Sequence, residues 1–226
     1  MVPIRWIHAR LRAIVGSMRR AALVLVMLAL GCKVREPPPI DKSYVDDFNR
    51  GGLGPDYNRT GGGYRIAGGV LNAKGAHNHP LWLARKLPAG DLQIDLDAWS
   101  TSPDGDIKIE LYGDGKSYDP DGNRYQATGY VLVLGGWKNS KSIIARMDEH
   151  GDEMATRTQP AVVANQHYHW RIIRRHDTIE WFVDDLTTPF LRYQDALPLA
   201  GRGHEYLAFN NWETDTWFDN LVIKRL

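Results

Sequence analysis

This 226-residue sequence has little cysteine, no helical repeat and no long apolar run. Cys32 is the only cysteine, which excludes an internal disulfide. The longest apolar run, from 21 to 30, is shorter than the roughly 20 residues that cross a bilayer. After it, no segment repeats apolar residues every 3.6 positions, which argues against a helical body. The sequence also has no glycine-rich phosphate loop, serine nucleophile elbow or cysteine nucleophile to support phosphoryl transfer or acyl hydrolysis.

The N-terminus has the pattern of an export signal. Residues 1–31 contain five arginines and no acid, and they end in the apolar run and Gly31. A basic start, an apolar stretch and a small residue together form a secretory signal. The segment "LALGC" resembles a bacterial lipobox, although Ala29 stands where leucine is usual. We expect cleavage before Cys32 and lipidation of Cys32; an ordinary secreted protein or an uncleaved anchor is the alternative. Lys33 favours the outer membrane of a Gram-negative envelope.

Removing residues 1–31 changes the charge of the chain. Lys plus Arg falls from 28 to 23 while Asp plus Glu stays at 27, so the net charge becomes about −4. No basic field remains to attract nucleic acid. Residues 32–42 contain three consecutive prolines, which favour an extended tether. Residues 43–226 are long enough for one domain with its own core. Met18 is a possible start in place of Met1.

Strand patterns fill the region after residue 42. Residues 92–99 place Leu, Ile, Leu and Ala on one face, and Gln, Asp, Asp and Trp on the other. Residues 107–112 alternate in the same way, which predicts strands with one dry and one polar face. Residues 129–137 are apolar on both faces and predict a central strand. Further strands are expected at 43–48, 64–73, 142–148, 168–175, 178–185, 205–212 and 217–226.

About ten to twelve strands without helices predict an all-β sandwich or barrel. Two sheets would pack with their apolar faces about 10 Å apart. The last strand, 217–226, is expected beside the first, 43–48, so that both ends of the domain join one sheet.

The order of these segments resembles the concanavalin A-like lectin/glucanase superfamily. The resemblance covers most of 43–226 and rests on "VDDFN", "YRIAGGVL", "IEWFVDD" and "WFDNLVIKRL". The branch that looks most similar is that of the 3-keto-disaccharide hydrolase-like domains. The resemblance implies a jelly-roll of two antiparallel sheets, sugars bound across one sheet, and a structural calcium near the chain ends. For that calcium it suggests Asp47 and Asp219.

Three carboxylates are candidates for catalysis. Asp95, Asp97 and Glu110 fall on the polar faces of their strands, and two carboxylates flanking a sugar bond can hydrolyse it. Laminarinase-type members of the superfamily carry two glutamates around an aspartate on one strand. Here Gln93 and Asp97 stand at the nearest equivalent places, a departure from that mechanism. The alternatives are a solvated charge ladder, with Lys108 neutralising an aspartate, or hydrogen bonding to a ligand without chemistry.

Aromatic residues off the apolar faces suggest a binding site, because a flat ring can cover the apolar face of a sugar. The same rings can instead serve in packing. Glycines in "GGWKN" permit close approach of a ligand to the backbone, and "NNWETD" combines amides, a ring and a carboxylate. The candidates for binding are Trp99, Tyr112, Trp137, Asn210, Trp212 and Glu213.

Three function classes follow from the sequence. The leading hypothesis is a lipid-anchored envelope protein whose β-sandwich binds carbohydrate and serves glycan binding or processing. The first alternative is a hydrolase acting on glycosides or keto-sugars with the carboxylates named above. The second is a non-catalytic domain that binds another envelope protein.

Overall fold

The computed structural model describes residues 36–118 and 125–226, and it is almost entirely β-structure. Within these ranges lie fifteen strands and one short helical turn. The strands are β1 (Ser43–Asp46), β2 (Tyr57–Arg59), β3 (Gly63–Ala67), β4 (Val70–Lys74), β5 (Leu81–Leu83), β6 (Leu92–Ser100), β7 (Ile107–Gly113), β8 (Tyr130–Gly135), β9 (Lys141–Arg146), β10 (Glu153–Arg157), β11 (Tyr168–Arg175), β12 (Thr178–Val183), β13 (Leu191–Gln194), β14 (Tyr206–Asn210) and β15 (Asp215–Arg225). The turn is α2 (Gly136–Asn139).

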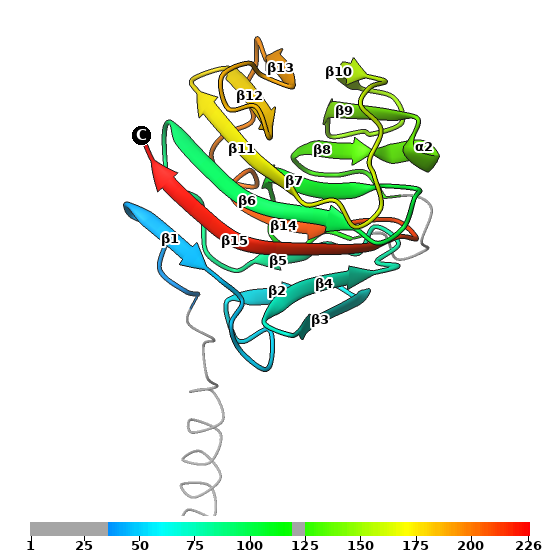
Figure 1. Ribbon diagram of the computed structural model, residues 1–226. Helices are drawn as coiled ribbons and strands as arrows, with labels where there is room; N and C mark the ends of the chain where they lie inside the picture. The colour runs from blue at the N-terminus through cyan, green and yellow to red at the C-terminus, as the bar shows by residue number, and fades with distance from the viewer. Residues whose placement is uncertain (1–35, 119–124) are drawn as a thin grey trace, which may run out of the picture. The chain divides into compact units, whose positions relative to one another are not determined.

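Two antiparallel sheets face each other (Figure 1). The first runs in the order β13-β12-β11-β6-β15-β4-β3, with β1 paired to β15. The second runs β10-β9-β8-β7-β14-β5-β2. The predicted jelly-roll sandwich is therefore confirmed. The first and last strands pair from Ser43 with Lys224 to Asp46 with Leu221, as expected from their sequences.

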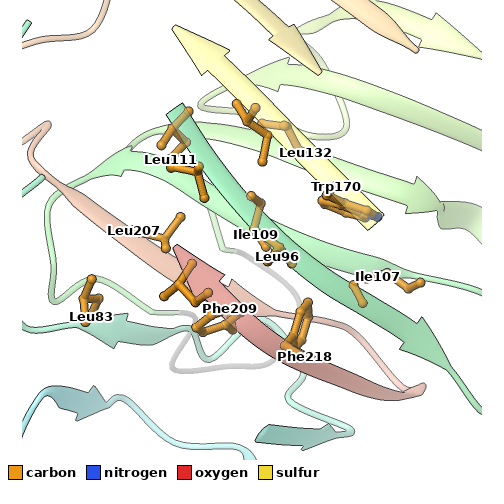
Figure 2. Packing of buried hydrophobic residues seen from close by; sticks show 14 of the residues in the cluster. Leu83, Leu96, Ile107, Ile109, Leu111, Leu132, Trp170, Leu207, Phe209 and Phe218 are labelled. Carbon is orange, nitrogen blue, oxygen red and sulfur yellow. The ribbon is translucent and has the colours of Figure 1, made fainter. Parts of the chain in front are cut away.

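The core lies between the sheets and is made by the alternation seen in the sequence. Leu92, Ile94, Leu96 and Ala98 of β6 are fully buried. Figure 2 shows Phe209 of β14 next to Phe218 of β15, and their ring centroids are 4.7 Å apart. Contacts of this kind across the two layers remove large apolar surfaces from water, which drives folding.

The seven-stranded sheet also carries apolar side chains on its outer face. Val131 and Val133 of β8 form a second small cluster there with Ile143 and Ala145 of β9, while Leu132 points into the main core. The prediction of an inner strand with two apolar faces is confirmed for Tyr130–Gly135, but the strand ends there, and Gly136 and Trp137 belong to the turn α2. No helix among the described residues is long and apolar enough to cross a membrane.

Candidate functional site

A cleft of about 420 Å³ opens on the outer face of the seven-stranded sheet. Its floor comes from β7 and β8, whose inward-facing residues belong to the core, so that their alternate residues face outward. Turns before β7, after β9 and after β14 form its walls. The lining residues are Asn78, Asp104, Asp106, Lys108, Tyr125, Val133, Trp137, Lys138, Glu149, His150, Trp212, Glu213 and Thr214.

A buried ion pair forms part of the cleft floor. The Lys108 side chain is 3% exposed, and its Nζ lies 2.8 Å from Glu149 Oε2 and 2.9 Å from Asn78 Oδ1. Burial is the largest influence on Glu149 and would raise its pKa, but the charge and hydrogen bond of Lys108, with smaller contributions from His150 and Asn78, together hold that pKa below its usual value. A buried charge of this kind is tolerated only when it is paired and hydrogen-bonded. The floor therefore holds fixed polar groups in a mostly apolar setting.

Glu110 lies under the cleft and is fully buried. The Tyr125 hydroxyl donates to Glu110 Oε2 at 2.6 Å, and Asn210 Nδ2 donates to Oε1 at 2.9 Å. Burial raises the pKa of Glu110 to about 7, against the opposing effect of these two hydrogen bonds. Both carboxylate oxygens are thus held by protein donors beneath the Tyr125 ring.

The sequence analysis did not include Asp106 among the site residues, and it expected Lys108 to neutralise an aspartate, whereas Lys108 pairs with Glu149. Asp106 Oδ2 accepts the backbone N–H of Trp212 at 2.5 Å, and burial raises its pKa. The signal for Asp106 and Lys108 was present, because every second residue of "DIKIE" shares the face of Glu110. Asn78 and Glu149 lie outside the strands that carry this signal, and only the tertiary structure brings them to the cleft.

Trp137 is presented by a strained backbone turn. Trp137, Lys138 and Asn139 have φ values of 50°, 56° and 61°, so three consecutive non-glycine residues of α2 are left-handed. This conformation costs a residue such as Trp137 or Lys138 about 1–2 kcal/mol, and asparagine tolerates it better. The Asn139 side chain holds the turn: its Nδ2 donates to the carbonyls of Pro103 and Val162, and its Oδ1 accepts the Val162 N–H. Strain retained in this way is typical of binding and active sites.

The Trp137 ring is oriented by its neighbours. Lys141 Nζ lies 4.1 Å from the ring centroid, and the His150 ring meets Trp137 edge-on at 5.7 Å. The ring is half-buried and lines the cleft. The turn and these contacts together present an aromatic surface to the cleft.

Trp212 is held by an equally well-bonded turn. The buried side chain of Asn211 donates to the carbonyls of Ala73 and Thr214 and accepts the Ala76 N–H at 2.8 Å. The Trp212 ring meets the His77 ring edge-on, with centroids 4.9 Å apart. Glu213, which follows Trp212, is exposed at the cleft.

Five of the predicted site residues therefore gather on this sheet face. Trp137, Trp212 and Glu213 line the cleft, and Glu110 and Asn210 lie beneath it. Tyr125 also lines the cleft, while residues 119–124 lie outside the described part of the chain.

Asp95, Asp97 and Trp99 are not part of this cleft, because they belong to β6 of the other sheet. Asp95 accepts from Arg171 Nε at 2.6 Å. Asp97 is 2.8 Å from the ring nitrogen Nδ1 of His169. The ring of Trp99 stacks on that of His167 with centroids 3.9 Å apart. The expectation that Asp95 and Asp97 share a polar face with Glu110 is not met. Alternation in the sequence shows which residues of one strand lie on the same side, but it does not show to which of the two sheets that strand belongs.

Tyr112 is also not part of the cleft. Tyr112 has a φ of 59° and is the extra residue of a bulge, because β14 pairs with Leu111 and then with Gly113. The bulge turns its side chain into the core. There the guanidinium carbon of Arg174 lies 4.1 Å from the centroid of its ring. Simple alternation would have placed Tyr112 beside Lys108 and Glu110.

The predicted calcium residues lie where the chain ends meet. Asp47 follows β1, and its Oδ1 accepts the Asn49 N–H at 3.1 Å. Burial raises the pKa of Asp219, as do the charges of Asp97 and Asp47. Two carboxylates fall short of the six to eight oxygens that calcium takes. Among residues 36–118 and 125–226, no three His, Cys, Asp or Glu form a group suited to a metal. Cys32 lies outside the described residues.

Comparisons with known proteins bear mainly on the fold. Residues 118–220 match a family model described as farnesoic acid O-methyltransferase, which covers less than half of the chain. A search of curated proteins finds no match.

Solved structures give broader coverage. The carbohydrate-binding module CBM66 from Bacillus subtilis has 13% identity and a TM-score of 0.57, covering 75% of this chain and 96% of its own. A B. subtilis protein of unknown function with a galectin-like fold has 12% identity and a TM-score of 0.59, with coverage of 82% and 96%. The Ca²⁺/Man3GlcNAc-bound lumenal domain of VIP36 has 9% identity and a TM-score of 0.61, with coverage of 82% and 88%. Identities this low establish only the fold: the chain shares the two-layered, concanavalin A-like β-sandwich of these structures.

Proposed function

We propose that this chain binds carbohydrate in the cleft lined by Trp137 and Trp212. The observation that carries the proposal is the strained, side-chain-tethered turn that presents Trp137 above a polar floor. An aromatic ring can cover the apolar face of a sugar, and fixed donors and acceptors can bond its hydroxyls. The volume of about 420 Å³ lies within the range usual for small-ligand sites.

The fold neighbours support the same class of ligand. CBM66 is described as a carbohydrate-binding module, and VIP36 is described with a bound Man3GlcNAc glycan. The methyltransferase family model begins at residue 118 and so leaves out Asn78, Asp106 and Lys108 of the cleft. The matched region therefore holds only part of the cleft.

Hydrolysis of glycosides or keto-sugars is the second candidate. A pKa of about 7 would suit Glu110 to general acid catalysis. Against this, Glu110, Asp106 and Glu149 each accept hydrogen bonds from protein donors, and Glu110 is covered by Tyr125. Incubation with oxidised and unoxidised disaccharides separates the two functions, because only an enzyme releases products, and Glu110→Gln would abolish their release.

The binding proposal is tested with two tryptophan variants. We expect Trp137→Ala and Trp212→Ala each to weaken glycan binding about tenfold or more, since each removes a large contact surface. The matched control is Trp99→Ala, which removes a half-buried tryptophan from the other sheet and should leave affinity unchanged. Binding is measured on a glycan array and then by calorimetry with the selected glycan. Undiminished binding by the Trp137→Ala, Trp212→Ala double variant would remove the site. The absence of any glycan binding would favour a protein partner.

Anchoring and calcium complete the proposal. We propose that Cys32 carries a lipid that holds the domain at the outer membrane. Metabolic labelling with a lipid precursor should be lost in Cys32→Ser. Calcium at Asp47 and Asp219 is supported by the Ca²⁺-bound VIP36 structure and by the proximity of these two carboxylates.

A further inference from the structure

A second cavity, separate from the cleft, opens where β11 and β15 end. Its volume is about 380 Å³, and it shares no lining residue with the cleft. The side chains that matter here are those of Asp91, Arg174, His176, Ala200 and Arg225, beside Leu226. Arg174 and Arg225 each carry a full positive charge, Asp91 carries a carboxylate, and the main chain of Leu226 ends in a second carboxylate.

Arg174 is the unusual member because it is buried. Trp170 and Ile172 precede it at alternate positions of β11 and are fully buried in the core. Arg174 follows the same alternation, and it is 7% exposed. Its guanidinium carbon lies over the Tyr112 ring at 4.1 Å. The core-facing side of the strand thus ends in a cation at the mouth of the cavity.

This cation has few partners within the chain. Its Nε donates to the His176 carbonyl at 3.1 Å, and its charge and a side-chain hydrogen bond act on Tyr112, where they oppose the burial that raises the pKa of that hydroxyl. No carboxylate from 36–118 or 125–226 lies within 4 Å of it, whereas the neighbouring Arg171 and Arg175 pair with Asp95 and Glu180. A buried charge is costly unless it is paired. Arg174 therefore lines the cavity as a buried cation without a carboxylate partner among the described residues.

Asp91 and Arg225 are the other charged side chains at the cavity. Asp91 Oδ1 accepts the backbone N–H of His176 at 2.8 Å, and Asp91 Oδ2 lies 3.8 Å from His176 Nδ1. Arg225 is exposed and lines the cavity, and its backbone N–H donates to the Lys42 carbonyl at 2.9 Å. Guanidinium groups bind carboxylate and phosphate oxygens in a bidentate manner.

We propose that this cavity binds a compact oxyanion, a phosphate or sulfate group, through Arg174 and Arg225. The anion pairs with the buried guanidinium and reaches it from the open side at His176. The group is either free in solution or carried on a sugar, and the two sources share this chemistry.

The test is a titration of the ¹⁵N-labelled full chain with inorganic phosphate, inorganic sulfate or glucose 6-phosphate at constant ionic strength. We expect saturable NMR shifts confined to Gly90, His176, Arg225 and the Arg174 side chain. Arg174→Gln should weaken binding tenfold or more. Arg175→Gln, one residue further on the exposed side of β11, should leave it unchanged. Tighter binding of glucose 6-phosphate than of inorganic phosphate would identify a phosphate carried on a sugar as the ligand. Equal affinity for the two would identify the free ion.

Two further variants keep the test decisive. Ala200→Glu places a negative charge at the cavity without touching the buried Arg174, so it should suppress binding even if Arg174→Gln fails to fold. A Gly-Gly extension after Leu226 moves the terminal carboxylate away from the cavity and should preserve or tighten binding. The absence of saturable shifts in both the original and the extended chain would overturn the proposal. Equal affinity in Ala200→Glu and the original chain would also overturn it.

Discussion

Glu110 shows how one buried carboxylate makes the stability of the whole domain depend on pH. Burial is the largest influence on this group and raises its pKa to about 7. In the unfolded chain the same carboxyl would titrate at its ordinary, lower value. Between the two values, the folded state holds a proton that the unfolded state has released. The free energy of unfolding therefore falls as the pH rises through this window.

Glu110→Gln should remove this dependence, because glutamine cannot ionise. We expect the original chain to lose about 1–3 kcal/mol between pH 5 and pH 8 and the variant to lose clearly less. Urea denaturation at four pH values measures the difference. Glu180→Gln, which alters a half-buried acid on β12, serves as the control and should keep the original slope. Parallel slopes for Glu110→Gln and the original chain would contradict the protonation of Glu110 near neutral pH.

At the scale of elements, the left-handed turn of α2 depends on Asn139. The side chain of Asn139 makes three hydrogen bonds to Pro103 and Val162, and its own φ of 61° disfavours alanine. Asn139→Ala should therefore destabilise the domain by about 1–3 kcal/mol. It should also weaken glycan binding, since Trp137 loses its fixed position.

Lys138→Gly is the matched control in the same turn. Lys138 is exposed and left-handed, so glycine relieves backbone strain and should stabilise the domain by about 1 kcal/mol. Thermal unfolding and calorimetric titration measure both variants. Opposite signs for the two stability changes support a strained, tethered turn, and equal stability of all three proteins would contradict it.

The alternating pattern in the sequence predicted most strands, and it predicted which of their side chains face the core. The pattern failed at Tyr112, because Tyr112 is an extra residue in β7 that interrupts the alternation of side chains between the two faces of the sheet. It could not separate Asp95 and Asp97 from Glu110, because the polar faces of two sheets look alike in sequence. Asn78 and Glu149 carried no pattern, since residues in connecting segments are positioned by contacts distant in the chain.

At the scale of the whole molecule, the two ends of the domain meet in one sheet. Burial raises the pKa of Asp219, and the negative charge of nearby Asp47 raises it further because the two carboxylates repel each other. Asp219→Asn should therefore raise the midpoint of thermal unfolding by about 1–3 °C in chelator at pH 7.

Stabilisation by millimolar calcium should require both Asp47 and Asp219. If the ion binds, it stabilises the folded state by mass action and raises the midpoint of the original chain but not of Asp47→Asn or Asp219→Asn. Asp185→Asn, an exposed acid after β12, is the control and should respond as the original chain does. An original chain that is indifferent to calcium would remove the metal from the proposal.

The sequence by itself determined that this domain is a two-layered β-sandwich, because a two-residue alternation can bury one side of a strand only against another sheet. It also determined which residues of β6 and β8 form the core, and that the last strand can pair with the first. Only the tertiary structure decided which polar face holds a cleft, which carboxylates are already bonded, and that Trp137 sits on a strained turn. These properties arise from bulges, turns and contacts between distant segments, which leave no periodic trace along the chain.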